Sequence, residues 1–300
     1  MKKLLFTLVS CCALLASAQQ VKVVEKSRLL NGVEGPAYFP VLNNSGNRLL
    51  FSGESARGLK IYDFDHRVVT RISDDYGAGV DATFGADGNV YYTVQTLGNE
   101  NLIYRTGLCY DVAHDTSSVV LEAQHGAISR QVGTAGVALR GRKTFASARN
   151  LGTAVYTQGS QVFVTVAGKT RAFSPVESHA GYLWASLSPN ADRVAFFAAG
   201  KGVVVIDLQG KVQAMLGNYE MPCWYNNDYI VAQDATDDGH QITSSHLVLL
   251  SADGRERHNL TEGTSMTMHP TSAAGKIVYT TIDGNLYLMK IAITPLKTVR

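Results

Sequence analysis

The chain has 300 residues, of which 45% are hydrophobic, so it can build a large core without disulfides or metals to stabilise it. Lysine and arginine number 27 and aspartate and glutamate 25, which gives a formal net charge of only +2. A chain so close to neutral lacks the basic surface expected of a protein that binds nucleic acid or an anionic membrane.

The first twenty residues, MKKLLFTLVSCCALLASAQQ, have the three parts of a secretory signal peptide. Two lysines form the charged start, an apolar run follows to Leu15, and Ala16-Ser17-Ala18 provides the small residues of a cleavage site. We therefore expect cleavage after Ala18, a periplasmic or secreted location, and a mature domain over residues 19–300. The apolar run is shorter than the roughly 20 residues needed to span a bilayer, and we expect no transmembrane segment.

The segment Leu8-Val9-Ser10-Cys11 resembles the lipobox of bacterial lipoproteins, in which Cys11 would carry the lipid anchor. Cleavage there would leave an unusually short signal, so we favour cleavage after Ala18. Loss of the two N-terminal lysines would make the mature chain neutral, with 25 residues of each charge. Cys109 and Cys223 would be its only cysteines, and their wide separation favours two buried thiols over a disulfide.

One pattern recurs six times along the chain: a polar turn rich in Gly, Asn or Asp, followed by a short β-rich strand. The six copies are NNSGNRLLFSG (43–53), GADGNVYYTVQ (85–95), SARNLGTAVYTQG (147–159), SPNADRVAFFAAG (188–200), YNNDYIVAQ (225–233) and TSAAGKIVYTTIDG (271–284). Such a turn is a hairpin signal. The strands begin near residues 48, 89, 153, 193, 228 and 276, at spacings of 41, 64, 40, 35 and 48. A spacing near 40 residues matches a four-stranded propeller blade.

Each unit continues with a further short strand, such as LKIYDF from Leu59 or GVVVIDLQG from Gly202, and most end in another, such as VVTRIS. The sixth unit lacks its fourth strand after NLYLMKI, and Val21–Leu30 can supply it. We therefore predict an all-β fold, a six-bladed β-propeller of four-stranded blades. The N-terminal strand closes the ring by pairing with the last blade, which removes unpaired edges. The alternative, a β-sandwich, gives no reason for a four-strand order to repeat at one period.

The units resemble the WD40-like PD40 repeats of TolB-type propellers, whose motif reads roughly Pro-x-Trp-Ser-Pro-Asp-Gly-x-x-Ile-Ala-Phe. LSPNADRVAFFA at 187–198 is similar to that motif, and MPCWYNNDYIVA keeps Pro222 and Trp224. The resemblance covers nearly the whole mature chain and implies an extracytoplasmic six-bladed propeller. TolB has an additional α/β domain before its propeller. We expect none here, because the signal peptide runs almost directly into the first strand.

The sequence contains no Gly-x-Ser-x-Gly elbow, phosphate-binding loop or His-Glu-x-x-His motif, and we predict no catalytic residue, metal or cofactor. His240 and His246 lie near two aspartates in DDGHQITSSH, a pattern that could hold a metal, but we interpret it as a solvated loop. His179 and His269 lie before or within innermost strands, which line the channel. Oligogalacturonate lyases, whose propellers resemble this repeat class, hold a metal with channel histidines. The resemblance therefore leaves a metal-assisted polysaccharide lyase, or another carbohydrate-binding protein, as an alternative.

Aromatic side chains near the same channel mouth suggest a binding site without catalysis. Tyr38, Tyr182, Trp184 and Trp224 belong to innermost strands or to their leads. Tyr and Trp are favoured anchors because they bury a large area at low entropic cost. We predict that they bind together with His179 and His269, and packing between blades is the alternative for all four aromatic residues.

The spacing of 64 residues identifies an insertion of about 20 residues, QHGAISRQVGTAGVALRGR at 124–142, between the second and third units. Insertions in propellers emerge as loops on one face, and such loops often bind partners. Arg130, Arg140 and Arg142 in this segment suit the recognition of carboxylate or phosphate groups. A solvated connection without a ligand is the alternative.

These features favour a non-enzymatic, extracytoplasmic platform for protein interactions in a bacterial cell envelope. The resemblance to TolB implies an envelope partner, such as an outer-membrane or peptidoglycan-associated lipoprotein. A subunit of a larger envelope assembly, without separable activity, remains open as well.

Overall fold

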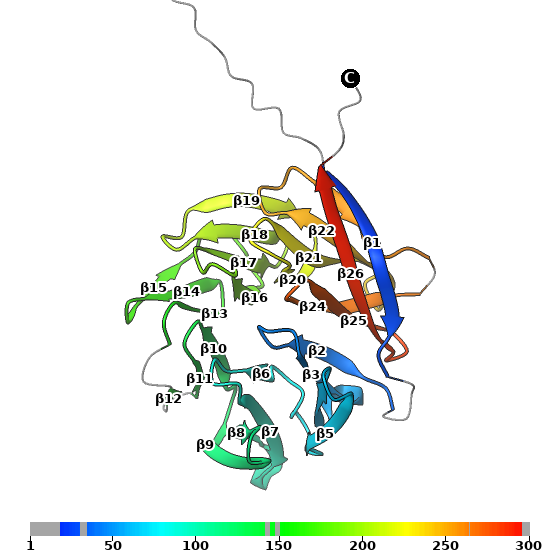
Figure 1. The fold of residues 1–300 in the computed structure, drawn as a ribbon. Coiled ribbons are helices and arrows are strands. Elements are labelled where there is room, and N and C mark those ends of the chain that lie inside the picture. Colours follow the sequence, from blue (N-terminus) through cyan, green and yellow to red (C-terminus); the bar gives the residue numbers. More distant parts are fainter. Residues whose placement is uncertain (1–18, 31–34, 142–144, 148–150, 264, 296–300) are drawn as a thin grey trace, which may run out of the picture.

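Six β-sheets stand around a central axis in the computed structural model (Figure 1). The structure describes residues 19–30, 35–141, 145–147, 151–263 and 265–295. The predicted six-bladed propeller is confirmed. In blades 1, 2, 4 and 5 the chain runs from the innermost strand to the outermost by antiparallel hairpins, as the repeated turn signals require.

Five of the blades are four-stranded sheets. Blade 1 consists of β2 (Tyr38–Leu42), β3 (Arg48–Ser52), β4 (Leu59–Asp63) and β5 (Val68–Ser73), and blade 2 of β6 (Thr83–Phe84), β7 (Val90–Leu97), β8 (Ile103–Asp111) and β9 (Thr116–His125). Blade 4 consists of β16 (Tyr182–Leu187), β17 (Arg193–Ala198), β18 (Gly202–Asp207) and β19 (Val212–Gly217). Blade 5 consists of β20 (Glu220–Trp224), β21 (Tyr229–Asp237), β22 (Ile242–Ser251) and β23 (Arg257–Asn259). Blade 6 consists of β24 (Thr267–Ala273), β25 (Lys276–Thr281), β26 (Leu286–Pro295) and β1 (Gln19–Arg28).

The N-terminal strand closes the ring, as predicted. β1 pairs antiparallel with β26 from Gln19 opposite Pro295 to Arg28 opposite Tyr287 (Figure 1). Partly buried Val21 and Val23 of β1 pack against the core of the neighbouring strands. The closure thus covers the edge of β26 and joins the two ends of the described chain in one sheet.

Blade 3 differs from the prediction at the inserted segment. Its four regular strands are β10 (Ser129–Gly133), β13 (Ala154–Gln158), β14 (Gln161–Val166) and β15 (Lys169–Phe173), and the same sheet adds β11 (Val137–Arg140) and β12 (Phe145–Ser147). The segment that we expected as a loop is therefore largely strand. Val137 and Leu139 are buried against Leu121 of blade 2, so apolar packing turns the insertion into sheet.

Apolar strands are buried on both sides where blades stack. Val203–Ile206 is fully buried: Val204 and Ile206 pack toward Val155 and Val162 of blade 3, and Val205 packs in a separate cluster with Ile230 of blade 5. This two-sided burial explains why these strands read as continuous apolar runs rather than as alternating patterns.

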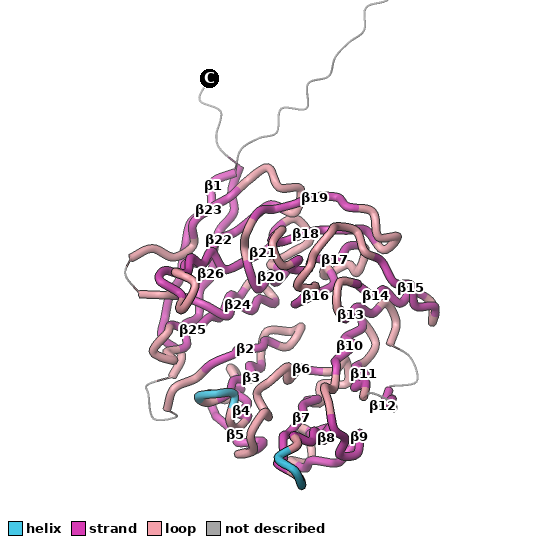
Figure 2. Tube along the Cα trace, turned by 180° about the vertical axis from the view of Figure 1, so that it is seen from behind, coloured by secondary structure: helices cyan, strands magenta, loops and turns pink. Residues whose placement is uncertain are grey.

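The alternation of strand direction defines two faces. We call the face with the links between blades and the turns between second and third strands the mouth face, and the opposite one the far face. Two 3-10 turns on the mouth face, η1 (Glu54–Ala56) and η2 (Asn99–Asn101), are cyan in Figure 2. Within the described residues, no helix has the length and apolar character needed to cross a bilayer.

Cys109 and Cys223 are free, as expected. Burial raises the pKa of the Cys223 thiol to about 12.

A candidate binding site at the channel mouth

Five bulky or charged residues at the starts of innermost strands have left-handed backbone conformations. They are Phe39 (φ 52°), Asp81 (φ 54°), Trp184 (φ 53°), Met221 (φ 49°) and His269 (φ 53°). This region of φ is costly for residues with a side chain and is often found at functional sites. Each residue comes from a different blade, and Arg130 at the start of β10 supplies the sixth member. We call these six residues the mouth ring.

The local sequence explains the distortion. In three blades the left-handed residue precedes a proline: Phe39-Pro40, Met221-Pro222 and His269-Pro270. Proline has no N–H to donate to the neighbouring strand, and in sheets it is confined to edges and bulges. The pairing register shifts at this point, between Tyr38 and Val41 in β2, for example. The innermost strands of blades 4, 5 and 6 shift at the equivalent place.

The mouth ring includes aromatic side chains from blades 1, 4 and 6. The ring centroids of Phe39 and His269, from adjacent blades, lie 4.4 Å apart. Burial lowers the pKa of His269 to about 4, so this imidazole is neutral at pH 7. Its backbone N–H donates to Gln233 Oε1 (3.2 Å), and its Nδ1 lies 3.3 Å from Thr280 Oγ1. Phe39 and Trp184 each remain 40% exposed, which leaves aromatic surface open to solvent at the mouth.

Blades 2 and 3 contribute the charged members of the mouth ring. Arg130 Nη1 donates to the carbonyl oxygens of Asp81 (2.7 Å) and Ala82 (3.0 Å), and its guanidinium lies 4.0 Å from the Asp81 carboxylate. Arg130 thus ties blade 3 to blade 2. We predicted Arg130 on an insertion loop, and it lies instead on β10, between β11 and β13 in the sheet of blade 3.

Two of the predicted aromatic residues have packing roles. Tyr182 is 2% exposed, and its hydroxyl donates to the Val176 carbonyl. Trp224 is 6% exposed, with its Nε1 donating to the Ser186 carbonyl at 3.2 Å. Tyr38 is half-buried beside the mouth ring and donates to the Ile282 carbonyl at 3.2 Å. Burial raises the pKa of Tyr38 above its usual value.

The remaining predicted residues lie apart from the mouth ring. His179 is exposed in the link before β16, 3.5 Å from the Glu177 carboxylate. Arg140 lies over the ring of Tyr156, with the guanidinium carbon 4.9 Å from its centroid. Arg130 and Arg140 alternate to opposite sides of the β10–β11 pair, so the structure does not gather the arginines in one cluster. Arg142 lies outside the described residues.

The histidines of DDGHQITSSH occupy a hairpin. His246 belongs to β22, and His240 is in the turn that precedes it. Asp238 Oδ1 accepts the backbone N–H groups of His240 and Gln241, both at 2.9 Å, which stabilises the turn. In the part of the chain that the structure describes, no group of three or more His, Cys, Asp or Glu side chains could hold a metal ion.

Phe39, Asp81 and Met221 were not among the residues predicted from the sequence. Three prolines at equivalent places in the repeats were a usable signal, since a proline early in an innermost strand indicates a bulge there. Asp81 has no such signal.

Exposed apolar side chains gather on the mouth face. Of the large apolar side chains that are exposed among the described residues, those on this face are Phe39, Tyr76, Val80, Leu97, Leu102, Ile103, Leu183, Trp184 and Ile282. Exposed apolar groups that lie close together mark interaction surfaces more often than scattered ones do.

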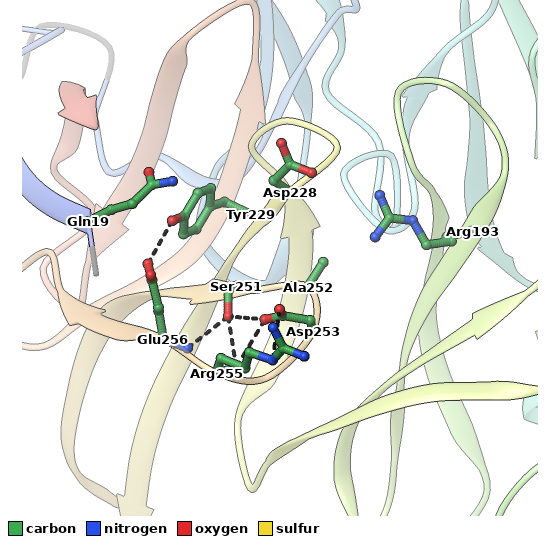
Figure 3. Close-up of a pocket in the computed structure, with 9 residues that line it drawn as sticks. All are labelled: Gln19, Arg193, Asp228, Tyr229, Ser251, Ala252, Asp253, Arg255 and Glu256. Carbon is green, nitrogen blue, oxygen red and sulfur yellow. Dashed lines mark hydrogen bonds and ion pairs between the residues drawn. The ribbon is translucent and has the colours of Figure 1, made fainter. Parts of the chain in front are cut away.

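A cavity of about 400 Å³ lies on the far face, at the turn between β22 and β23 (Figure 3). Gln19, Asp228 and Glu256 are among its lining residues. Ser251 Oγ accepts the backbone N–H groups of Arg255 (2.9 Å) and Glu256 (2.8 Å), and Glu256 accepts the Tyr229 hydroxyl at 2.7 Å. These polar groups hydrogen-bond to the protein itself and stabilise the turn, which gives them a structural role.

No family model matches the chain, and no curated protein matches it. Several solved structures are similar to the chain. TolB from Acinetobacter baumannii is 16% identical with a TM-score of 0.55, over 79% of this chain and 57% of that one. A catalytically inactive variant of virginiamycin B lyase from Staphylococcus aureus, solved with quinupristin, is 12% identical with a TM-score of 0.60, over 90% of this chain and 99% of that one. The β-propeller domain of Cps50 (Swd1) from Myceliophteria thermophila is 8% identical with a TM-score of 0.63, over 91% of this chain and 100% of that one. At such low identities the likeness shows a β-propeller fold that TolB shares, and the PD40 assignment of the repeats stays a prediction.

Proposed function

We propose that this protein is a non-enzymatic platform for protein interactions in a bacterial cell envelope, and that it binds its partner on the mouth face. The observation that carries the proposal is the mouth ring, where large side chains occupy left-handed backbone positions and Phe39 and Trp184 stay exposed. Such strain persists only where the surrounding structure enforces it, and it clusters at ligand-binding sites.

The surrounding surface supports a protein partner. The exposed apolar side chains of the mouth face extend well beyond the mouth ring, from Leu97 in blade 2 to Ile282 in blade 6. A stable protein interface buries about 800 Å² on each partner, which needs a broad face rather than a pocket. Aromatic anchors surrounded by polar groups are typical of interaction hot spots.

The envelope location is supported by the signal-peptide pattern of residues 1–18 and by the TolB-like fold. Cell fractionation and N-terminal sequencing test it: we expect an extracytoplasmic protein that begins at Gln19. A protein recovered from the cytoplasm with Met1 intact would contradict the location. By resemblance to TolB, an outer-membrane or peptidoglycan-associated lipoprotein is the partner that we propose first.

Photo-crosslinking in intact cells tests the binding face. A photoreactive residue replaces exposed Leu183 beside the mouth ring, and in a matched control it replaces exposed Val166 on the far face. We expect one discrete crosslinked partner from position 183 and none from position 166, with loss of the product when Trp184→Ala and Phe39→Ala are added. Equal products from both faces, or none from position 183, would refute the proposal.

A further inference from the structure

Two hairpins on the mouth face are longer than the others. The second and third strands pair over eight residues in blade 2 and over nine in blade 5. The equivalent strands pair over four to six residues in blades 1, 3, 4 and 6. In all six blades the pairing of the second and third strands starts at the far face. The additional residue pairs in blades 2 and 5 therefore lengthen these two hairpins at the mouth face.

The two long hairpins stand on opposite sides of the channel. Blades 2 and 5 are three positions apart in a ring of six, and Figure 1 shows β7 and β8 across the ring from β21 and β22. At about 3.3 Å per residue, two or three additional pairs raise the tips by about 7 to 10 Å above the next longest hairpin. The mouth therefore has a raised wall on each of two opposed sides.

The wall from blade 2 has an apolar tip. Leu97 is 70% exposed, Ile103 43% and Leu102 36%. The turn between them has Glu100 and Asn101 in left-handed conformations. Apolar side chains clustered at a projecting tip expose surface to water without any contribution to the core, as expected of a contact site for another molecule.

The wall from blade 5 has an acidic tip formed by Asp237 and Asp238. Backbone N–H groups of Gln241 and His240 lower the pKa of Asp238, so its carboxylate is charged at neutral pH. Nearby Glu220 has a raised pKa, because of burial first and the charge of Asp237 second.

The mouth face is acidic in its connecting segments. Among the described residues, its links and second-to-third-strand turns contain nine acidic residues against two basic ones, Arg57 and Lys201. The acidic residues are Glu54, Asp74, Asp75, Asp81, Glu100, Glu177, Asp238, Glu262 and Asp283. Two copies of this face would repel each other, so charge disfavours a second copy of the chain as the occupant.

We propose that the partner inserts a segment with both cationic and apolar side chains across the mouth, between the hairpins of blades 2 and 5. Its apolar side chains pack against Leu97 and Ile103 and against the aromatic residues of the mouth ring. Its lysine or arginine side chains meet Asp237 and Asp238. This inference rests on the proposed function and names the chemistry of the partner.

Binding of synthetic peptides to the purified protein tests the chemistry. The probe is a labelled 15-residue peptide of Lys, Leu and Ser, compared with a Glu-for-Lys version and a Ser-for-Leu version by fluorescence anisotropy. We expect the first peptide to bind at least tenfold more tightly than either relative, and to weaken at least tenfold between 50 and 300 mM salt. Equal affinity for the Glu-for-Lys peptide would overturn the proposal.

Variants of the two tips test the location. Asp237→Asn with Asp238→Asn should weaken the first peptide about tenfold, because each Asn removes a charge and keeps the oxygen that accepts the turn's N–H groups. Leu97→Ser with Ile103→Ser should weaken it similarly. The matched control, Asp65→Asn with Asp228→Asn on the far face, should leave the affinity unchanged. Weaker peptide binding by the control variant, or unchanged peptide binding by both tip variants, would overturn the proposal.

The same variants in the cell separate the two proposals. If the crosslink from position 183 persists in both tip variants but disappears with Trp184→Ala, the platform stands and the hairpin proposal fails. If the crosslinked partner segment is acidic, or is a second copy of this chain, the hairpin proposal fails as well.

Discussion

The turns of the far face and the starts of the innermost strands at the mouth face use their side chains in different ways. On the far face, side chains hydrogen-bond to their own turns: Asp207 Oδ1 accepts the N–H groups of Gln209 and Lys211, both at 2.9 Å, and Ser188 Oγ accepts that of Arg193 at 3.0 Å. On the mouth face, large side chains such as Trp184 occupy left-handed backbone positions and remain exposed.

The far-face turns serve folding, whereas the mouth ring departs from what folding alone favours. The far-face turns agree with local propensity, because Asx and Ser side chains satisfy the turn backbone. The mouth ring violates local propensity at five positions, and such local violations are expected at functional sites. We therefore expect substitutions on the far face to reduce stability, and substitutions at the mouth ring to reduce binding.

The two tryptophans give the largest contrast. Trp224 is buried at the far end of β20. Trp224→Ala should lower the protein's free energy of unfolding by about 3–5 kcal/mol, because a buried ring is removed. Trp184→Ala should cost about 1 kcal/mol, since the exposed ring loses mainly its contact with Phe197 at 5.3 Å. Urea denaturation measures both, and equal losses would remove the distinction between the faces.

Two nearby glycines on the mouth face, Gly200 and Gly202, differ in how much room each leaves for a side chain. At Gly202 (φ +84°) an added Cβ would lie 1.8 Å from the Gly217 carbonyl oxygen, so Gly202→Ala should cost about 3 kcal/mol or more. Gly200 (φ +78°) has open space, and Gly200→Ala should cost only the backbone strain of about 1–2 kcal/mol. Thermal or urea unfolding of the pair checks this, and a larger loss at position 200 would contradict it.

Ser188 tests the far face. Its buried hydroxyl accepts the N–H groups of Asp192 (3.2 Å) and Arg193 (3.0 Å) and donates to Asp192 Oδ1 (2.9 Å). Ser188→Ala should lower the free energy of unfolding by about 1–2 kcal/mol through unsatisfied turn groups. The crosslink from position 183 should be unaffected, and its loss would mean that the faces are not independent.

His269 gives an effect of a different kind, a dependence of stability on pH. Burial holds its pKa at about 4 in the folded chain, below the ordinary value of 6.5. The unfolded chain therefore binds this proton first, and stability falls as the pH drops from 6.5 toward 4. We expect the urea midpoint of the unsubstituted protein to fall more between pH 7 and pH 4.5 than that of His269→Gln, which lacks the imidazole. Parallel declines in both proteins would contradict it.

Sequence patterns predicted much of the fold and less of the site. Turn signals placed the hairpins, and the missing fourth strand of the sixth unit identified β1 as the closing strand. The insertion was misread because Gly and small residues suggested a loop, whereas Val137 and Leu139 find an apolar partner in blade 2. Trp184 and Trp224 looked alike in sequence, but Trp184 occupies the bulge near the mouth face, whereas Trp224 lies at the far end of β20, where its ring is buried.

The number of blades, the strand order and the closure of the ring could be predicted from the sequence, because they depend on local turn chemistry and on the apolar content of each strand. Which side chains reach the mouth could not be predicted in this way. That choice depends on bulges that turn single residues and on contacts between blades, such as Arg130 with Asp81, that join residues 49 positions apart. Local patterns do not specify such contacts, because they form only when the ring closes.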